Sequence, residues 1–119
     1  MGIIADNDAK LNAALGNGTL FDVFTDVYHP EVTMIEATGD SWTGLDANLE
    51  REKGFFGSIT EFKGGSITDV VVDEAQGISY NRQWMHALLA NGHEMNMTEI
   101  SVRHWKDGKI IKEQFFYNA

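Results

Sequence analysis

Cysteine is absent from the sequence, and proline occurs once, at Pro30. Without cysteine the chain can form no disulfide, no thiolate metal site and no cysteine nucleophile, and it suits the reducing cytoplasm, where we expect it. No apolar run approaches the roughly 20 residues that a membrane-spanning helix needs. The first residues do not combine a basic segment with a long apolar one, as a secretory signal would. We therefore expect neither membrane association nor export.

Positive charge is scarce as well. Nine Lys and Arg stand against eighteen Asp and Glu, which gives a formal net charge of −9. The field of such a chain repels the phosphates of nucleic acids and of anionic lipids. We expect no nucleic-acid partner and no membrane partner.

Apolar residues, in contrast, are plentiful enough for one core. Hydrophobic residues make up 43% and aromatic residues 11% of the 119 residues, which is not the composition of a disordered or fibrous chain. A chain of this length buries one core rather than two. Because no repeat or Pro/Ser-rich linker divides the sequence, residues 1–119 are expected to form a single domain.

Helical spacing dominates the first half of the chain. Apolar residues recur at intervals of three and four and predict helices over 4–15, 20–27 and 45–56. A segment over 32–36 that is rich in strand-forming residues predicts a short strand before the third helix. That helix is charged over residues 50–53.

From residue 59 onward, strand-forming runs alternate with turn residues, which is typical of an antiparallel meander. Four long strands are predicted, at about 59–72, 78–89, 93–106 and 109–116, with turns at 73–77, Asn91-Gly92 and Asp107-Gly108. Gly64-Gly65, inside the first of these strands, predicts a bulge that bends the sheet into a cup.

Three segments carry a family resemblance: Tyr28-His29-Pro30-Glu31-Val32, Trp42-Thr43-Gly44-Leu45-Asp46 and Trp105-Lys106-Asp107-Gly108-Lys109-Ile110-Ile111-Lys112-Glu113. With the order of the predicted elements, the chain resembles the SnoaL-like branch of the nuclear transport factor 2-like superfamily over nearly its whole length. The resemblance implies an α+β fold in which three N-terminal helices pack in the concave face of a strongly curved mixed or antiparallel sheet, forming a cone with an internal pocket. The superfamily includes polyketide cyclases, ketosteroid isomerases, dehydratases, epoxide hydrolases and domains that only bind, so the fold does not determine the function.

Compared with ketosteroid isomerase, this sequence has a carboxylate at one of the three catalytic positions and lacks the residues of the other two. The general base, eight residues after a tyrosine that ends the second helix, falls on Glu36 when counted from Tyr28. The two oxyanion donors fall on Ser101 and near Asn12, which are not the acid and the phenol that this isomerase uses. The missing donors favour a generic acid–base reaction over steroid isomerisation. The cyclase branch has a catalytic aspartate near the last strands, and no aspartate follows Asp107 here.

The hairpin at Asn91-Gly92 predicts which side chains face the pocket. A two-residue loop places Ala90 opposite His93, and side chains then alternate faces along both strands. The face that lines the cavity, by the resemblance, carries Tyr80, Arg82, Trp84, His86, Leu88, Met95, Met97, Glu99, Ser101, Arg103 and Trp105, and the last strand adds Glu113, Phe115 and Tyr117.

Within this set we assign roles by side-chain chemistry. The candidate catalytic residues are Glu36, Glu99 and His86, and the candidate ligand-binding residues are Trp84, Met97, Ser101, Arg103, Glu113, Phe115 and Tyr117. Carboxyl groups whose pKa values are pushed apart by burial can serve as separate acid and base. Structural alternatives stay open, because an arginine can neutralise Glu99, His86 can be an ordinary core histidine and Glu36 can simply be solvated. Trp84 and Tyr117 can serve only as pocket wall.

No metal or cofactor is expected. The four histidines show no ligand spacing, and the sequence has no Gly-rich phosphate loop and no Gly-x-Ser-x-Gly elbow. The chain is interpreted as a small apolar-ligand pocket protein. One hypothesis is a cofactor-independent isomerase, cyclase or dehydratase in which Glu36 or Glu99 abstracts a proton and His86 or Tyr117 assists. The alternative is a non-catalytic ligand-binding or assembly domain whose polar pocket groups are structural.

The opposite face of the sheet predicts a homodimer. Its mixed side chains, which no predicted helix is left to cover, are Asn81, Gln83, Met85, Ala87, Asn96, Thr98, Ile100, Val102, His104, Ile110 and Phe116. A contiguous exposed apolar patch usually marks a partner site, and twofold pairing is the commonest arrangement.

Overall fold

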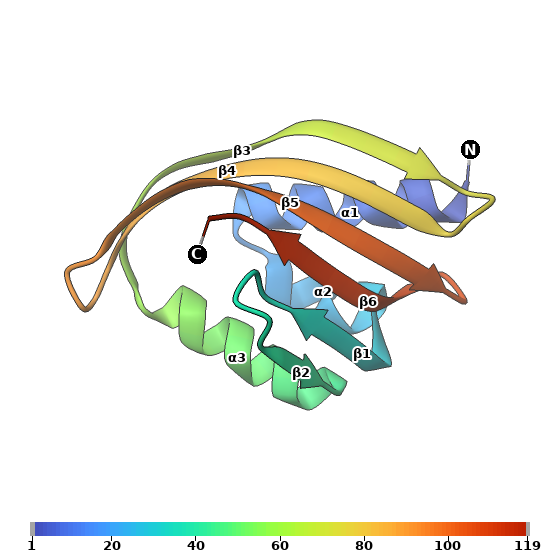
Figure 1. Ribbon diagram of the computed structural model, residues 1–119, viewed down its shortest axis with the longest axis horizontal. Coiled ribbons are helices and arrows are strands. Elements are labelled where there is room, and N and C mark those ends of the chain that lie inside the picture. The colour runs from blue at the N-terminus through green and yellow to red at the C-terminus, as the bar shows by residue number, and fades with distance from the viewer. Residues whose placement is uncertain (1, 119) are drawn as a thin grey trace.

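A computed structural model describes residues 2–118, which form three helices and one six-stranded mixed sheet (Figure 1). The helices are α1 (Ile3–Asn17), α2 (Leu20–Val27) and α3 (Leu45–Gly57). The strands are β1 (Tyr28–Ile35), β2 (Ser41–Thr43), β3 (Ile59–Asp73), β4 (Ile78–Leu89), β5 (Glu94–Lys106) and β6 (Lys109–Phe116). The α+β fold predicted from the sequence is confirmed.

The sheet is strongly curved, and the helices lie on its concave side. The strand order is β2-β1-β6-β5-β4-β3, in which β1 and β6 run parallel and the other neighbours run antiparallel. The long strands β3, β4 and β5 arch over the helices (Figure 1). Helix α1 packs under β3 and β4, α2 packs on β1 and β6, and α3 packs on β1 and β2. No helix among residues 2–118 is long and apolar enough to cross a membrane.

The apolar core lies where α1 and α2 meet β1 and β6. Its fully buried side chains include Leu11, Phe24, Val27, Val32 and Ile110. Burying a side chain of this size stabilises a fold by about 1.5–3 kcal/mol relative to leaving it exposed. These residues fill one end of the arch, and the other end stays open for the cavity described below.

The predicted irregularity at Gly64-Gly65 is confirmed. The β3–β4 register shifts between Phe62 and Gly64. A Cβ atom at Gly64 would lie 3.0 Å from the ring of Trp84, and one at Gly65 would lie 3.1 Å from the ring of Phe62. Glycine therefore allows both aromatic rings to lie against the strand where it bends.

The first strand is longer than predicted. It begins at Tyr28 and contains Pro30, which has no N–H group for the ladder. The parallel pairing with β6 is accordingly irregular between Tyr28 and Thr33. Strand β2, which was not predicted, has only three residues, and the side-chain amide of Asn48 secures it by lying 3.0 Å from the carbonyl oxygen of Trp42.

The predicted register of the β4–β5 hairpin is wrong by one residue. Leu89 N–H donates to the carbonyl of His93, and Gly92 N–H donates to the carbonyl of Leu89. Gly92 has φ of 86°, so the loop has three residues and ends in a left-handed glycine, a turn followed by a bulge. Because a shift of one residue reverses the facing of a strand, the β4 side chains lie on the face opposite to the predicted one, while those of β5 lie as predicted.

Two parts of the predicted outer face are wrong, one because of this register and one because of a second irregularity. Gln83 pairs with Glu99 and Met85 pairs with Met97, so these β4 side chains point to the concave side, as do Asn81 and Ala87. Ile110 is fully buried and not on the outer face, because the β5–β6 register shifts between His104 and Trp105.

Candidate functional site

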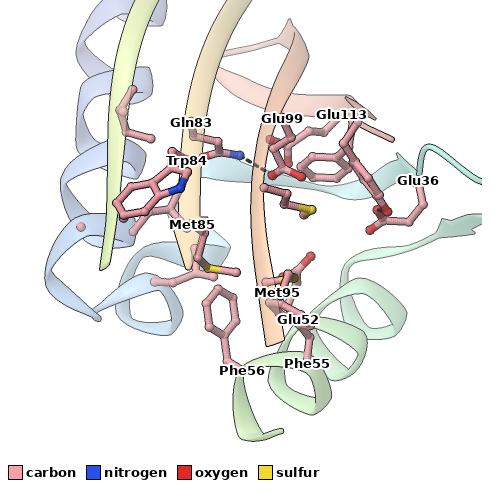
Figure 2. A pocket seen from close by; sticks show the side chains of 18 of the residues that line it. Glu36, Glu52, Phe55, Phe56, Gln83, Trp84, Met85, Met95, Glu99 and Glu113 are labelled. Atoms are coloured by element: carbon pink, nitrogen blue, oxygen red, sulfur yellow. Dashed lines mark hydrogen bonds between the residues drawn. The ribbon is translucent and has the colours of Figure 1, made fainter. Parts of the chain in front are cut away.

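A cavity of about 560 Å³ lies between α3 and the concave side of the sheet. This volume is within the range of small-molecule sites. Much of its wall is aromatic or methionine: Phe24, Phe55, Phe56, Met85, Met95, Met97 and Phe115. Figure 2 shows the carboxyl groups of Glu99 and Glu113 close together on one side of the cavity, with Phe55 and Phe56 of α3 on another.

Glu99 presents a lightly restrained carboxyl group to the cavity. It projects from the concave face of β5, and its neighbour Gln83 donates one hydrogen bond of 2.6 Å to its Oε1 atom (Figure 2). Burial raises the pKa of Glu99 to about 7, and the negative charges of Glu113 and Glu36 act in the same direction against the hydrogen bond from Gln83. Both protonation states of Glu99 are thus populated near neutral pH.

Glu36, just beyond the end of β1, also borders the cavity but is held by two donors. Arg51 Nη1 lies 2.7 Å from its Oε1 atom, and the Tyr117 hydroxyl donates a 2.8 Å hydrogen bond to its Oε2 atom. Burial and this carboxylate raise the pKa of Tyr117 to about 12. The Arg51 guanidinium lies over the Trp42 ring, 4.6 Å from its centroid, so the cation that holds Glu36 is itself positioned.

Glu52 is a cavity carboxyl group that the sequence analysis did not single out. Its side chain is only 15% exposed, and Arg51 Nη2 lies 3.1 Å from its Oε1 atom. Burial raises the pKa of Glu52 to about 7, in spite of the opposing charge of Arg51. A sequence signal for it exists, since Glu52 occupies the same helical stripe as Leu49 and Phe56, at intervals of three and four.

Glu113 is the most tightly bound acid of the cavity wall. Tyr28 and Ser101 each donate a hydroxyl hydrogen bond of 2.6 Å to its carboxylate, and Arg103 Nε donates one of 3.0 Å. Burial raises the pKa of Tyr28 well above its usual value, and the charge of Glu113 adds to the effect. With three donors, Glu113 is a structural carboxylate whose oxygens are already engaged in hydrogen bonds.

Arg103 links Glu113 to a second buried acid, Asp8 of α1. Its Nη1 atom lies 2.8 Å from Asp8 Oδ1, and both side chains are almost completely buried. Asp8 also accepts hydrogen bonds from Ser79 and Asn81. One guanidinium therefore serves two buried carboxylates, which explains how the fold tolerates them.

Three of the candidate residues do not have the predicted placement. His86 is absent from the cavity wall because of the register shift, and its Nε2 atom lies 2.5 Å from the exposed Glu94. Trp84 borders the cavity, but it pairs with Thr98 on the convex face, where its indole donates to Asn96.

Ser101 is on the predicted face but beneath the cavity, where α1 covers the sheet. It is completely buried and bound to Glu113. Asn12, the other position of a missing oxyanion donor, is engaged with Asn81 and Arg103. Neither residue therefore offers a free donor to the cavity.

The remaining candidates do border the cavity. They are Glu36, Met97, Glu99, Arg103, Glu113, Phe115 and Tyr117. The cavity residues Gln83 and Met85 were missed because the two-residue loop placed them on the other face of β4. No group of three or more His, Cys, Asp or Glu side chains among the described residues is arranged to hold a metal ion.

The family model of the SnoaL-like domain matches residues 4–117. The chain belongs to the SnoaL-like domain family. A search of curated proteins finds no significant match to this SnoaL-like domain.

Solved structures show the same fold. A candidate SnoaL-like polyketide cyclase from Mesorhizobium loti superposes with a TM-score of 0.81 at 21% identity, over 96% of this chain and 98% of that chain. A candidate isomerase from Bacillus subtilis superposes with a TM-score of 0.78 at 12% identity, over 98% and 86%. The structure of Bal32a, from a soil-derived mobile gene cassette, gives 0.81 at 15% identity, over 97% and 88%. At these identities the similarity supports the fold of the SnoaL-like domain, and its chemistry has to be argued from the cavity.

Proposed function

We propose that this SnoaL-like domain is a cofactor-independent isomerase, cyclase or dehydratase that acts on a small apolar carbonyl compound, with Glu99 as the residue that moves the proton. The supporting observation is the environment of Glu99. Its carboxyl group faces an apolar cavity, has one neutral hydrogen-bond partner, and has a pKa of about 7. A general base is most effective when its pKa is near the working pH, and a similar pKa allows the same group to return the proton as an acid.

The proposed step is proton abstraction next to the carbonyl group. The Glu99 carboxylate takes the proton, the carbon–hydrogen electron pair moves to form an enolate, and protonated Glu99 then returns the proton to the same carbon or to another one. Tyr117, whose hydroxyl borders the cavity, is the proposed hydrogen-bond donor that assists at the oxygen, and for this its single proton has to turn from Glu36 to the ligand. His86 has no part in this proposal, because it does not reach the cavity.

Glu99 is a better candidate for the base than Glu36 or Glu113. Glu36 is paired with Arg51 and Tyr117, and Glu113 accepts three hydrogen bonds. The carboxyl oxygens of both residues are therefore already engaged, whereas Glu99 accepts one hydrogen bond from a neutral group. The same hydrogen bonds and ion pair on Glu36 and Glu113 support the second function, a non-catalytic ligand-binding domain. The experiment below distinguishes the catalytic from the non-catalytic function.

The Glu99→Gln variant is expected to lose proton transfer. Small apolar ketones are incubated with the protein in heavy water, and deuterium uptake next to the carbonyl group is followed by proton nuclear magnetic resonance. We expect the wild-type chain to accelerate uptake for at least one ketone, and E99Q to be slower by about a hundredfold or more, because general acid–base groups contribute about that much.

The matched control is Glu94→Gln. Glu94 lies on the same strand but is exposed on the convex side, so this variant changes the net charge equally and should keep the exchange rate. Equal rates for E99Q and wild type would remove Glu99 as the base. Binding of the ketones without any exchange would favour the non-catalytic function instead.

A homodimer through the convex face of the sheet is a further part of the proposal. Exposed apolar side chains gather there in two cross-strand pairs, Val71 with Tyr80 and Ile100 with Phe116. The exposed Arg82–Asp69 ion pair lies beside them. A patch that carries both charges and apolar side chains can pair with a copy of itself.

The Val71→Lys variant is expected to be monomeric where the wild-type chain has the mass of two chains in light scattering. Lysine at this position would bring two positive charges together across a twofold axis. Val70→Lys is the matched control, because Val70 is similarly exposed but pairs with Asn81 on the concave side. A monomeric wild-type chain would end the dimer proposal.

A further inference from the structure

The cavity has more negative than positive groups in its wall. Of the groups in residues 2–118, four carboxyl groups border it, those of Glu36, Glu52, Glu99 and Glu113, and two guanidinium groups do. A large apolar cavity does not need acidic residues for its stability, and each one that faces it loses hydration. The arrangement therefore indicates something about the molecule that the cavity accepts.

The two guanidinium groups are already shared. Arg51 contacts both Glu36 and Glu52, and Arg103 contacts both Glu113 and Asp8. Among residues 2–118, the hydrogen-bond partner of Glu99 is the neutral amide of Gln83, and no cation forms an ion pair with it, although the charge of Arg103 acts on it from farther away. When the carboxyl groups of the wall are ionised, residues 2–118 therefore leave at least one negative charge without a positive partner.

Aromatic groups stand around the same space. Phe55, Phe56, Phe115 and Tyr117 all border the cavity. The faces of aromatic rings attract ammonium groups as well as apolar groups. The wall thus combines two features that favour an organic cation, namely carboxyl groups without their own counter-charge and aromatic rings.

We infer that the cavity binds an apolar molecule carrying a protonated amine, with the ammonium group lying beside Glu99, which has no ion-pair partner, and near Glu52, which shares Arg51 with Glu36. The inference builds on the proposed function by placing the substrate in the same cavity, and it narrows the substrate to an amino-carbonyl compound.

Binding should be coupled to proton release. The free cavity holds protons on Glu52 and Glu99 near neutral pH, since both have a pKa of about 7. An ammonium ion favours their ionised forms, so it displaces those protons, whereas a neutral ligand does not. The other titratable groups of the wall are Tyr28, Glu36, Arg51, His93, Arg103, Glu113 and Tyr117.

The test compares three probes of the same shape by titration calorimetry: phenylbutylamine, phenylbutanol and phenylbutyrate. At about pH 8 and physiological ionic strength, we expect the protonated amine to bind at least about tenfold more tightly than the alcohol, and the carboxylate to bind most weakly. Lowering the pH to about 6 should weaken only the amine, because Glu52 and Glu99 then hold their protons. Near neutral pH the measured enthalpy of amine binding should depend on the ionisation enthalpy of the buffer, because the buffer takes up the released protons.

Variants localise the effect. Glu52→Gln and Glu99→Gln should each reduce the ratio of the amine affinity to the alcohol affinity. The matched controls are Glu50→Gln on α3 and Glu94→Gln on β5, which remove an exposed charge from the same two elements.

Three results would overturn the inference: equal affinity for alcohol and amine, no binding of the amine, or an equal loss of preference in the control variants. In the last case the net charge of −9 would be the cause rather than the cavity. Deuterium exchange without an amine preference would reject this inference and leave the proposed function in place. An amine preference without exchange would support this inference and reject the catalytic role.

Discussion

Replacing Arg103 with methionine is expected to lower the free energy of unfolding by about 3–5 kcal/mol, because removing one partner of a buried ion pair leaves an uncompensated buried charge. Here one substitution affects two acids, Asp8 and Glu113, since Arg103 contacts both. Methionine has a similar length and removes the charge with little change in packing volume. Urea unfolding followed by circular dichroism measures the difference.

Arg82→Met is the matched control for this variant. Arg82 also pairs with an aspartate, Asp69, and lies on the neighbouring strand, but both side chains are 54% exposed. Water screens such a pair, so we expect a much smaller change in the free energy of unfolding. A loss for R103M no larger than that for R82M would show that the buried network of Arg103 is not a major source of stability.

The fold was predictable from the sequence because, apart from the short strand predicted at 32–36, its period changes once. Helical spacing up to residue 56 and strand-like runs from residue 59 correspond to α3 and β3 in the structure. Strand β2 could not be predicted, because three residues carry no period. It is held by pairing with β1 and by the amide of Asn48, and neither contact can be recognised from the residues of β2 alone.

The candidate site was predictable in part, and the errors on β4 come from a single loop. Asn91-Gly92 is compatible with a two-residue or a three-residue turn, and the two choices put opposite β4 side chains in the cavity. His86 was therefore predicted where Gln83 and Met85 lie, while Glu99 on β5 was placed correctly.

The burial of two acids, Asp8 and Glu52, could have been predicted from their spacing relative to apolar residues of the same helix. Asp8 is four residues after Ile4 and three before Leu11, and Glu52 is three residues after Leu49 and four before Phe56. Each acid therefore shares the inward stripe of its helix. Asp8 is completely buried against Arg103, and Glu52 borders the cavity. An acid on an apolar stripe is thus a better indicator of the site than the charged residues around it.

The Glu52→Gln variant is expected to be more stable than the wild-type chain above neutral pH and equally stable at acidic pH. The pKa of Glu52 is raised from 4.5 to about 7 in the folded state. Its contribution to stability is therefore fully present below about pH 4.5 and is lost as the pH rises through about 7. Glutamine stays neutral at every pH, so the advantage of E52Q should grow between these limits and then level off.

The size of the effect follows from the pKa shift. One pKa unit corresponds to about 1.4 kcal/mol, which sets an upper limit of about 3 kcal/mol for Glu52 and leaves about 1–3 kcal/mol after some residual hydration. Glu99→Gln should behave similarly, because its pKa is also raised to about 7. The charge of Glu99 raises the pKa of Glu52, and the charges of Glu36 and Glu113 raise the pKa of both acids. The double variant should therefore gain less than the sum of the single variants.

Urea unfolding of the wild-type chain and both variants at about pH 4, 6 and 8 measures these differences. These pH values span the range over which Glu52 and Glu99 lose their protons in the folded state. Glu50→Gln is the control on the same helix as Glu52, and because Glu50 is exposed its carboxylate is hydrated in both states. A stability difference that does not change with pH, or one that appears equally in E50Q, would contradict the prediction. A gain confined to E52Q and E99Q above neutral pH would mean that these acids destabilise the empty fold at working pH, as groups kept for binding or catalysis do.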